Sequence, residues 1–201
     1  MSAAATGNVS SFINTDSNRI KSTTQLKVLG IWFDNRPGVE LHVEKLEKKF
    51  RSRLWALRHL KRSGMSSEDM LYLYKSLIRP VADFASVTYH TMLNQGQSDR
   101  LEKLQKRALK IVYGTSLTTE ELLSVSGVNL LHDRREEMFL KFAMKVKDNE
   151  RINKKWLPLA SESVHDTRNK QTYKEITART ERLKNSPIFA MRRLLNRQLM
   201  N

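Results

Sequence analysis

The chain has 201 residues, of which 39% are hydrophobic and 28% charged, so it can bury one modest core or two small helical ones. It has no cysteine, which excludes disulfides, thiolate chemistry and the usual structural zinc sites, and no apolar run reaches the roughly 18 residues that span a membrane. The 36 Lys and Arg against 21 Asp and Glu leave a net charge of +15, which favours a polyanionic partner such as nucleic acid.

The first part of the chain predicts little packed structure. Residues 1–25 are rich in Ser, Thr, Asn and Ala, which is typical of a flexible lead. Residues 26–33, with the sequence LKVLGIWF, are apolar and aromatic, and turn residues follow, so we expect a strand and a turn over residues 26–38. One strand cannot pair its own backbone groups, so it needs a weaker strand upstream, around residues 10–13, or has lost its partner.

A long amphipathic helix is predicted over residues 39–62. Its apolar residues recur at intervals of three and four, and Gly64 follows its end. The opposite face is basic and carries Lys45, Lys48, Lys49, Arg51, Arg53, Arg58, Lys61 and Arg62. Ser66 begins a second helix, which Pro80 should kink or break. The apolar segment that follows, residues 81–89, is expected to be the most buried part of the chain.

A third amphipathic helix is predicted over residues 97–113, ending at Gly114. Its outer face is also basic and carries Arg100, Lys103, Lys106, Arg107 and Lys110. Two further helices, over residues 118–126 and 131–146, complete a helical domain that extends from residue 39 to residue 148.

The end of the chain predicts a looser region. Residues 149–186 are polar and indicate a loosely ordered connection, and Pro187 suits the first turn of a short final helix that ends near residue 199. Residues 149–201 are therefore expected to be a polar connection and a C-terminal helix. The fold class that we predict is mainly α, with a helical bundle preceded by one short strand or hairpin.

Three blocks follow one another along the chain: LKVLGIWFD, then KKFRSRLWALRHLKRSGMSSEDMLYLYKSLIRPVADFASVTYHTML, then QSDRLEKLQKRALKIVYG. Together they resemble the C-terminal third of reverse transcriptases from non-LTR retrotransposons of the jockey and CR1 type. The resemblance covers about residues 25–150. In addition, RLKNSPIFAMRRLLN at residues 182–196 is similar to the ending of such open reading frames.

This resemblance implies roles for two of the predicted elements. Leu29 and Gly30 would correspond to the primer-grip motif, next to the polymerase palm. The helices over residues 39–113 would correspond to the thumb, which holds the duplex of template and primer. A glycine in a strand allows close approach of another backbone or a ligand, but a plain β-bulge or strand end has the same signature.

The resemblance also implies that the catalytic palm is missing. Family members carry adjacent aspartates there, because the two metal ions of polymerisation need carboxylate ligands. No Asp-Asp pair occurs in this chain, and its adjacent acidic pairs lie at or inside predicted helices. We therefore expect no polymerisation by the chain alone, no cofactor, and metal ions held only by the missing palm.

The candidate site consists of residues that could follow a phosphate backbone without recognising bases. The expected nucleic-acid-binding residues are Leu29, Gly30, Lys45, Lys48, Lys49, Arg53, Arg58, Lys61, Arg62, Lys103, Lys106, Arg107 and Lys110. Trp32 and Trp55 could stack on bases, although aromatic residues at such spacing more often belong to the core. The five histidines have no metal-binding spacing, so we expect no metal site.

The expected partners are an RNA/DNA hybrid or another duplex, together with a polymerase palm in a longer chain, and no membrane. The expected location is intracellular, in the cytoplasm or nucleus. A helical module that binds only proteins remains the alternative, because a charged helix face is often simply solvated. That alternative predicts an exposed apolar patch and binding that survives high salt.

Overall fold

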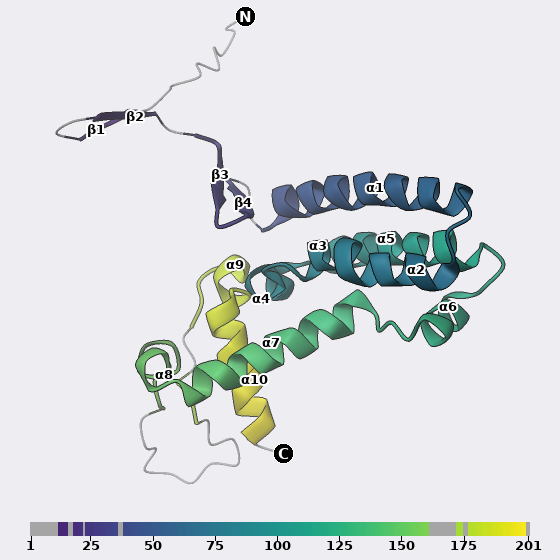
Figure 1. Ribbon diagram of the computed structural model, residues 1–201. Helices are drawn as coiled ribbons and strands as arrows, with labels where there is room; N and C mark the ends of the chain where they lie inside the picture. Colours follow the sequence, from purple (N-terminus) through teal and green to yellow (C-terminus); the bar gives the residue numbers. More distant parts are fainter. Residues whose placement is uncertain are drawn as a thin grey trace, which may run out of the picture.

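The computed structural model describes residues 12–15, 18–21, 23–35, 38–160, 172–174 and 177–199. Within them the chain is mainly helical, and antiparallel hairpins precede the helices, which confirms the predicted fold class (Figure 1). The strands are β1 (Phe12–Thr15), β2 (Asn18–Lys21), β3 (Gln25–Val28) and β4 (Ile31–Asp34). None of the described helices is long and apolar enough to cross a membrane.

The prediction of a single strand over residues 26–33 is wrong. That run folds back on itself, so that β3 pairs with β4 in antiparallel register, while β1 pairs with β2 in a separate hairpin. The reason is a two-residue turn at Leu29 and Gly30, whose φ angles of 46° and 92° are both positive. Positive φ at both central residues is what a tight type I′ hairpin turn requires, and glycine adopts it without strain.

The first hydrophobic cluster is formed mainly by three helices that pack against one another, α1 (Glu40–Arg62), α2 (Ser67–Leu73) and α5 (Gln95–Tyr113). The predicted periodicity is confirmed, because Phe50, Leu54 and Leu57 of α1 are almost completely buried. The helix starts are capped by polar side chains: the Ser66 hydroxyl accepts from the Asp69 N–H, and Asn94 forms a capping box before α5. The helix α6 (Thr119–Ser126) closes this cluster.

The chain between α2 and α5 is broken into short pieces. A π-helical turn, η1 (Tyr74–Ile78), precedes α3 (Pro80–Asp83), which fits the predicted disruption at Pro80. Next come α4 (Ser86–Tyr89) and a 3-10 turn, η2 (His90–Met92). The expectation that residues 81–89 are the most buried segment is wrong, because Phe84 leaves the helical conformation and its side chain is 56% exposed.

A second hydrophobic cluster lies around α7 (Leu131–Asp148), α8 (Glu150–Trp156) and α10 (Pro187–Leu199), and α9 (Glu181–Lys184) precedes α10 (Figure 1). Residues from the stretch predicted to be a polar connection belong to it, since Leu157 and Tyr173 are buried. Asn196 of α10 holds Tyr173 with two hydrogen bonds, one to its N–H and one to its carbonyl oxygen. The described part of residues 149–186 therefore contributes to a core.

Candidate nucleic-acid interface

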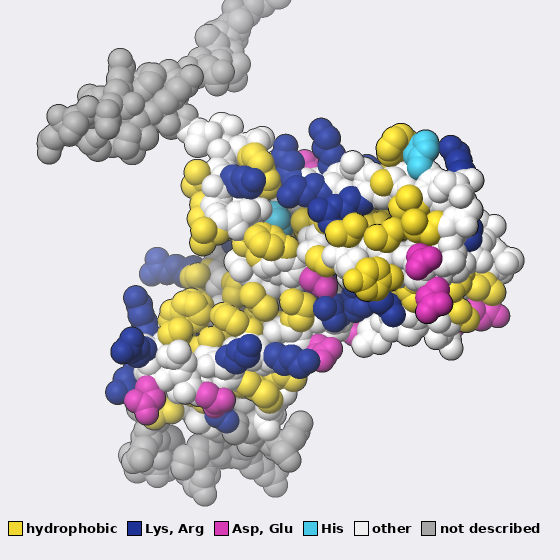
Figure 2. All heavy atoms as spheres, viewed as in Figure 1, with side chains coloured by type: hydrophobic (Ala, Val, Ile, Leu, Met, Phe, Trp, Pro, Cys, Tyr) yellow, Lys and Arg dark blue, Asp and Glu magenta, His cyan; other side chains and the backbone are white. Residues whose placement is uncertain are grey.

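A pocket of about 220 Å³ lies between the β3–β4 turn, α1 and α3. It brings together four residues that the sequence singled out, namely Gly30, Lys45, Lys49 and Arg53. The other lining residues are Trp32, His42, Leu46, Pro80, Val81 and Phe84. Figure 2 shows Lys and Arg side chains gathered over the hairpin end of α1. We call this site the basic pocket.

The hairpin turn is fixed against α3 by a close contact. A Cβ atom placed on Gly30 would lie 2.6 Å from Cε1 of Phe84, so only glycine allows this approach. Leu29, the other residue of the motif, does not line the pocket, and its side chain is 92% exposed at the hairpin tip. Position 30 needs glycine for two reasons: its φ is positive, and its backbone packs closely against the Phe84 ring.

Trp32 of β4 lies between two lysines. The Nζ atoms of Lys45 and Lys27 lie 5.0 Å and 5.7 Å from the centre of its ring, within the range of cation–π attraction. Lys27 lies directly opposite Trp32 in the hairpin register. Lys27 was not among the predicted site residues, because a single strand over residues 26–33 would not pair it with Trp32.

Arg53 has a structural contact as well as a place at the pocket. Its guanidinium donates a hydrogen bond to the carbonyl oxygen of Leu77 in the π-helical turn. Pro80, which follows this turn, has no N–H to donate to the preceding carbonyls. Part of the donor capacity of Arg53 is therefore used within the protein, and this contact holds α1 to η1.

The other predicted cations of α1 differ in their surroundings. Lys61 donates to the Val112 carbonyl at 2.8 Å, so it caps the C-terminal end of α5, where a positive charge is favourable. Four are exposed, and no ion pair joins them to another described residue: Lys48, Lys49, Arg58 and Arg62. Only Lys49 of these four lines the basic pocket.

The predicted cations of α5 do not join the basic pocket. Lys103 and Lys106 line a different pocket of about 280 Å³, which α5 forms with α6. Arg107 is exposed and Lys110 is half-buried. Both basic helix faces were predicted to bind nucleic acid, and the structure places Lys103 and Lys106 at a different pocket from Lys45 and Lys49.

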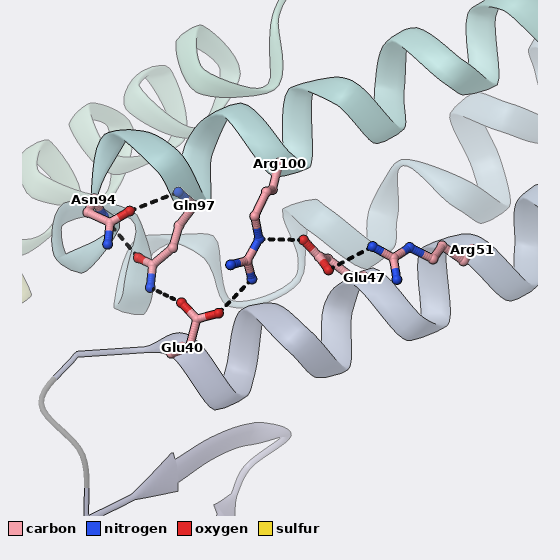
Figure 3. Close-up of polar contacts among 6 residues, drawn as sticks. All are labelled: Glu40, Glu47, Arg51, Asn94, Gln97 and Arg100. Atoms are coloured by element: carbon pink, nitrogen blue, oxygen red, sulfur yellow. Dashed lines mark hydrogen bonds and ion pairs between the residues drawn. The ribbon is translucent and has the colours of Figure 1, made fainter.

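Arg100 was expected on the outer face of α5, but it joins α5 to α1 (Figure 3). Its Nη2 lies 2.7 Å from a carboxylate oxygen of Glu40, and its Nε lies 2.7 Å from one of Glu47. Gln97 also donates to Glu40 at 2.7 Å, and Arg51 pairs with Glu47 at 3.0 Å. The hydrogen bonds that Arg100 donates to Glu47 and Glu40 raise the pKa of its guanidinium, and the network joins α5 to α1.

His42 lies beneath the basic pocket and is almost fully buried. Its Nδ1 is 3.5 Å from the Trp32 N–H, and its ring meets Tyr89 edge-on at 4.8 Å. Burial, followed by the positive charge of Lys49, lowers the pKa of His42 to about 4. The histidine is therefore neutral at physiological pH, so it adds no cation to the pocket.

Among the described residues, no three His, Asp or Glu side chains gather closely enough to hold a metal ion. Comparisons of the chain with protein-family models, curated proteins and solved structures give no significant match.

Proposed function

We propose that this chain is the nucleic-acid-binding, thumb-like region of a retroelement reverse transcriptase, and that the basic pocket contacts the phosphate backbone. One observation carries the proposal: Lys45, Lys49 and Arg53 of one helix converge with the lysine-flanked ring of Trp32. The family assignment is supported by the three sequence blocks described above. Polymerisation is outside the proposal, because the palm aspartates of that family have no counterpart here.

The geometry suits backbone contacts better than base recognition. Lysines on a rigid helix can follow successive phosphates, and such contacts do not depend on sequence. The half-buried Trp32 offers an aromatic edge or face to a sugar or a base at the rim of the pocket. We therefore expect binding that tolerates many sequences and weakens steeply with salt, with a preference for an RNA/DNA hybrid if the thumb geometry applies.

A salt series tests the proposal. The affinity of the chain for an RNA/DNA hybrid, duplex DNA and single strands is measured by fluorescence anisotropy at several NaCl concentrations. In the double variant Lys45→Ala/Lys49→Ala, the slope of log K against log salt should become shallower by roughly 1.8 on duplex DNA, about 0.9 for each lost phosphate contact.

A matched double variant, Lys103→Ala/Lys106→Ala, removes the same charge from the pocket beside α6. It should leave the slope nearly unchanged, because these lysines lie away from the basic pocket. Equal effects of the two double variants would indicate diffuse attraction to a basic protein and would overturn the proposed site. Absent or salt-independent binding of the unmodified chain would overturn nucleic-acid binding altogether.

A further inference from the structure

A second hollow of about 250 Å³ runs beside the basic pocket, between α1 and the α2–η1 segment. We call it the apolar groove. It is lined by Ala56, Leu57 and Leu60 of α1, by Leu73, Leu77 and Ile78 of the opposite segment, and by Arg53. Arg53 is the one charged residue among those that line it. The groove therefore suits an apolar ligand better than a phosphate backbone.

The apolar groove is open to solvent on both walls. Leu77 is 56% exposed, and Ala56 on the opposite wall is also exposed. In Figure 2 apolar side chains lie between the cations of α1 and the surface of α2. Covering such a surface is favourable by roughly 25 cal/mol for each Å² of apolar area removed from water. A contiguous exposed apolar surface of this kind marks an interaction site more often than scattered residues do.

The charge around the apolar groove changes along its length. Arg53 lines both the groove and the basic pocket, so the two hollows are adjacent. Lys49 and Lys45 lie beyond Arg53, toward the hairpin, while Leu60 lies at the opposite end. From Lys45 to Leu60 is 15 residues of helix, or roughly 22 Å. Among the residues that line the two hollows, the cations therefore lie at the hairpin end, and the opposite end is apolar.

A second copy of the chain is a poor occupant for this surface. Each copy carries a net charge of +15, and association would bring two basic surfaces together. The occupant needs an apolar stripe and negative charge at one end. A helix provides both in one segment of four turns, and two packed helices offer a groove into which a third can lay its side chains.

We propose that the apolar groove binds an acidic amphipathic helix of a partner protein. Its apolar stripe lies between α1 and α2, and its acidic end lies against Arg53 and Lys49. This proposal does not rest on nucleic-acid binding, because most groove residues are apolar, although Arg53 and Lys49 also line the basic pocket. It places the acidic end of the partner helix toward the hairpin, where these two cations lie.

The first test uses four synthetic 16-residue peptides with the full chain. Two carry an apolar stripe at helical spacing and four Glu, in the first turn of one peptide and in the last turn of the other. The third replaces Glu by Lys, and the fourth has the acidic composition with a scrambled stripe. Fluorescence anisotropy should show saturable binding of one of the two acidic peptides, with at least tenfold weaker binding of the basic and the scrambled peptides. Equal binding of the acidic and basic peptides, or of the scrambled peptide, would overturn the proposal.

The second test uses matched variants of the chain. Leu77→Ser should reduce the affinity for the acidic peptide at least tenfold. Val125→Ser should change that affinity less than twofold, because Val125 is similarly exposed at 59% but lies on α6. Ala56→Gln, which fills the groove without changing charge, should act like Leu77→Ser. Because these positions are exposed, we expect each variant to keep the helical circular dichroism of the parent.

Two controls keep this inference separate from the proposed function. Leu77→Ser should bind the RNA/DNA hybrid within twofold of the parent, whereas Lys45→Ala/Lys49→Ala should weaken hybrid binding. Loss of hybrid binding alone would leave the groove proposal standing. Sedimentation of the chain without peptide tests the remaining occupant: a dimer that Leu77→Ser dissociates would show that a second copy covers the groove, and would overturn the partner helix.

Discussion

The two hydrophobic clusters are held together by different kinds of polar contact. In the first cluster, Arg100 of α5 pairs with Glu40 and Glu47 of α1, so side chains of two regular helices bind one another. In the second, Asn196 of α10 binds the backbone of Tyr173. Similarly, the Arg192 side chain donates to the Trp156 carbonyl at 2.7 Å. Regular helices need few such bonds, whereas irregular chain must have its backbone groups satisfied by side chains before it can be buried.

The helix α7 belongs to both clusters. Leu131 at its beginning is part of the first, and Phe139 is part of the second. Between them, the fully buried Arg135 donates to Ser98 of α5 at 3.0 Å. Because α7 contacts both clusters, they can unfold either as one cooperative unit or as two.

Two leucines that are equally buried provide the sharpest comparison. Leu57→Ala in the first cluster and Leu195→Ala in the second should each reduce the free energy of unfolding by about 2–5 kcal/mol, because both side chains are at most 2% exposed. By hydrogen exchange, Leu57→Ala should reduce protection throughout α1 and α5. Leu195→Ala should reduce it mainly in α8 and α10, if each cluster opens as its own unit.

The opposite result would remove the distinction between the clusters. If both variants reduce the protection of α5 amides by the same factor, the molecule unfolds as one cooperative unit. In that case α7, through Leu131 and Arg135, couples the clusters more strongly than their separate contacts indicate.

Acid should weaken both regions through buried histidines. Burial lowers the pKa of His42 in the first region and of His90 beside Phe139 to about 4, below the ordinary value of 6.5. Between pH 6.5 and 4 the unfolded chain binds protons that the folded chain does not, so stability is complete above pH 6.5 and falls as the pH decreases. The buried His42 should cost about 2 kcal/mol at pH 5, and the half-buried His90 should cost less, because water screens its charge.

Urea unfolding between pH 8 and pH 5 measures this effect. His42→Gln should remove the larger part of this loss of stability, and His90→Gln should remove the smaller part. A variant whose dependence on pH equals that of the parent would show that the histidine is already charged in the folded protein.

The polar contacts themselves should differ in their response to salt. Asn196→Ala leaves the buried N–H and carbonyl of Tyr173 unpaired, which should cost about 2 kcal/mol at any salt concentration. Arg100→Ala should cost about 1 kcal/mol or less, because the Arg100 side chain is 38% exposed and water screens its ion pairs. That smaller cost should decrease further when NaCl is added.

Urea unfolding at low and high NaCl distinguishes the two variants. If Asn196→Ala also loses its effect in salt, the second cluster is stabilised by charge rather than by backbone hydrogen bonds. If Arg100→Ala costs as much as Asn196→Ala, the network of Figure 3 is less screened than its exposure implies.

The regular helices were predictable because their information is local. Phe50, Leu54 and Leu57 recur at the helical period, and Ser66 has the residue type that caps a helix start. The hairpin was missed because its two strands form one continuous apolar run. Only the dihedral angles at Leu29 and Gly30 show where that run reverses.

The sequence by itself determined the helical class, the helix start at Ser66 and the large positive charge, because each depends on residues close together in the chain or on composition. The tertiary structure alone decided which cations share a pocket. It placed Lys45 and Lys49 beside Trp32, used Lys61 to cap α5, and turned Lys103 toward α6. Helical spacing specifies the face on which a side chain lies, but the partner at that face is set by packing between elements far apart in the sequence.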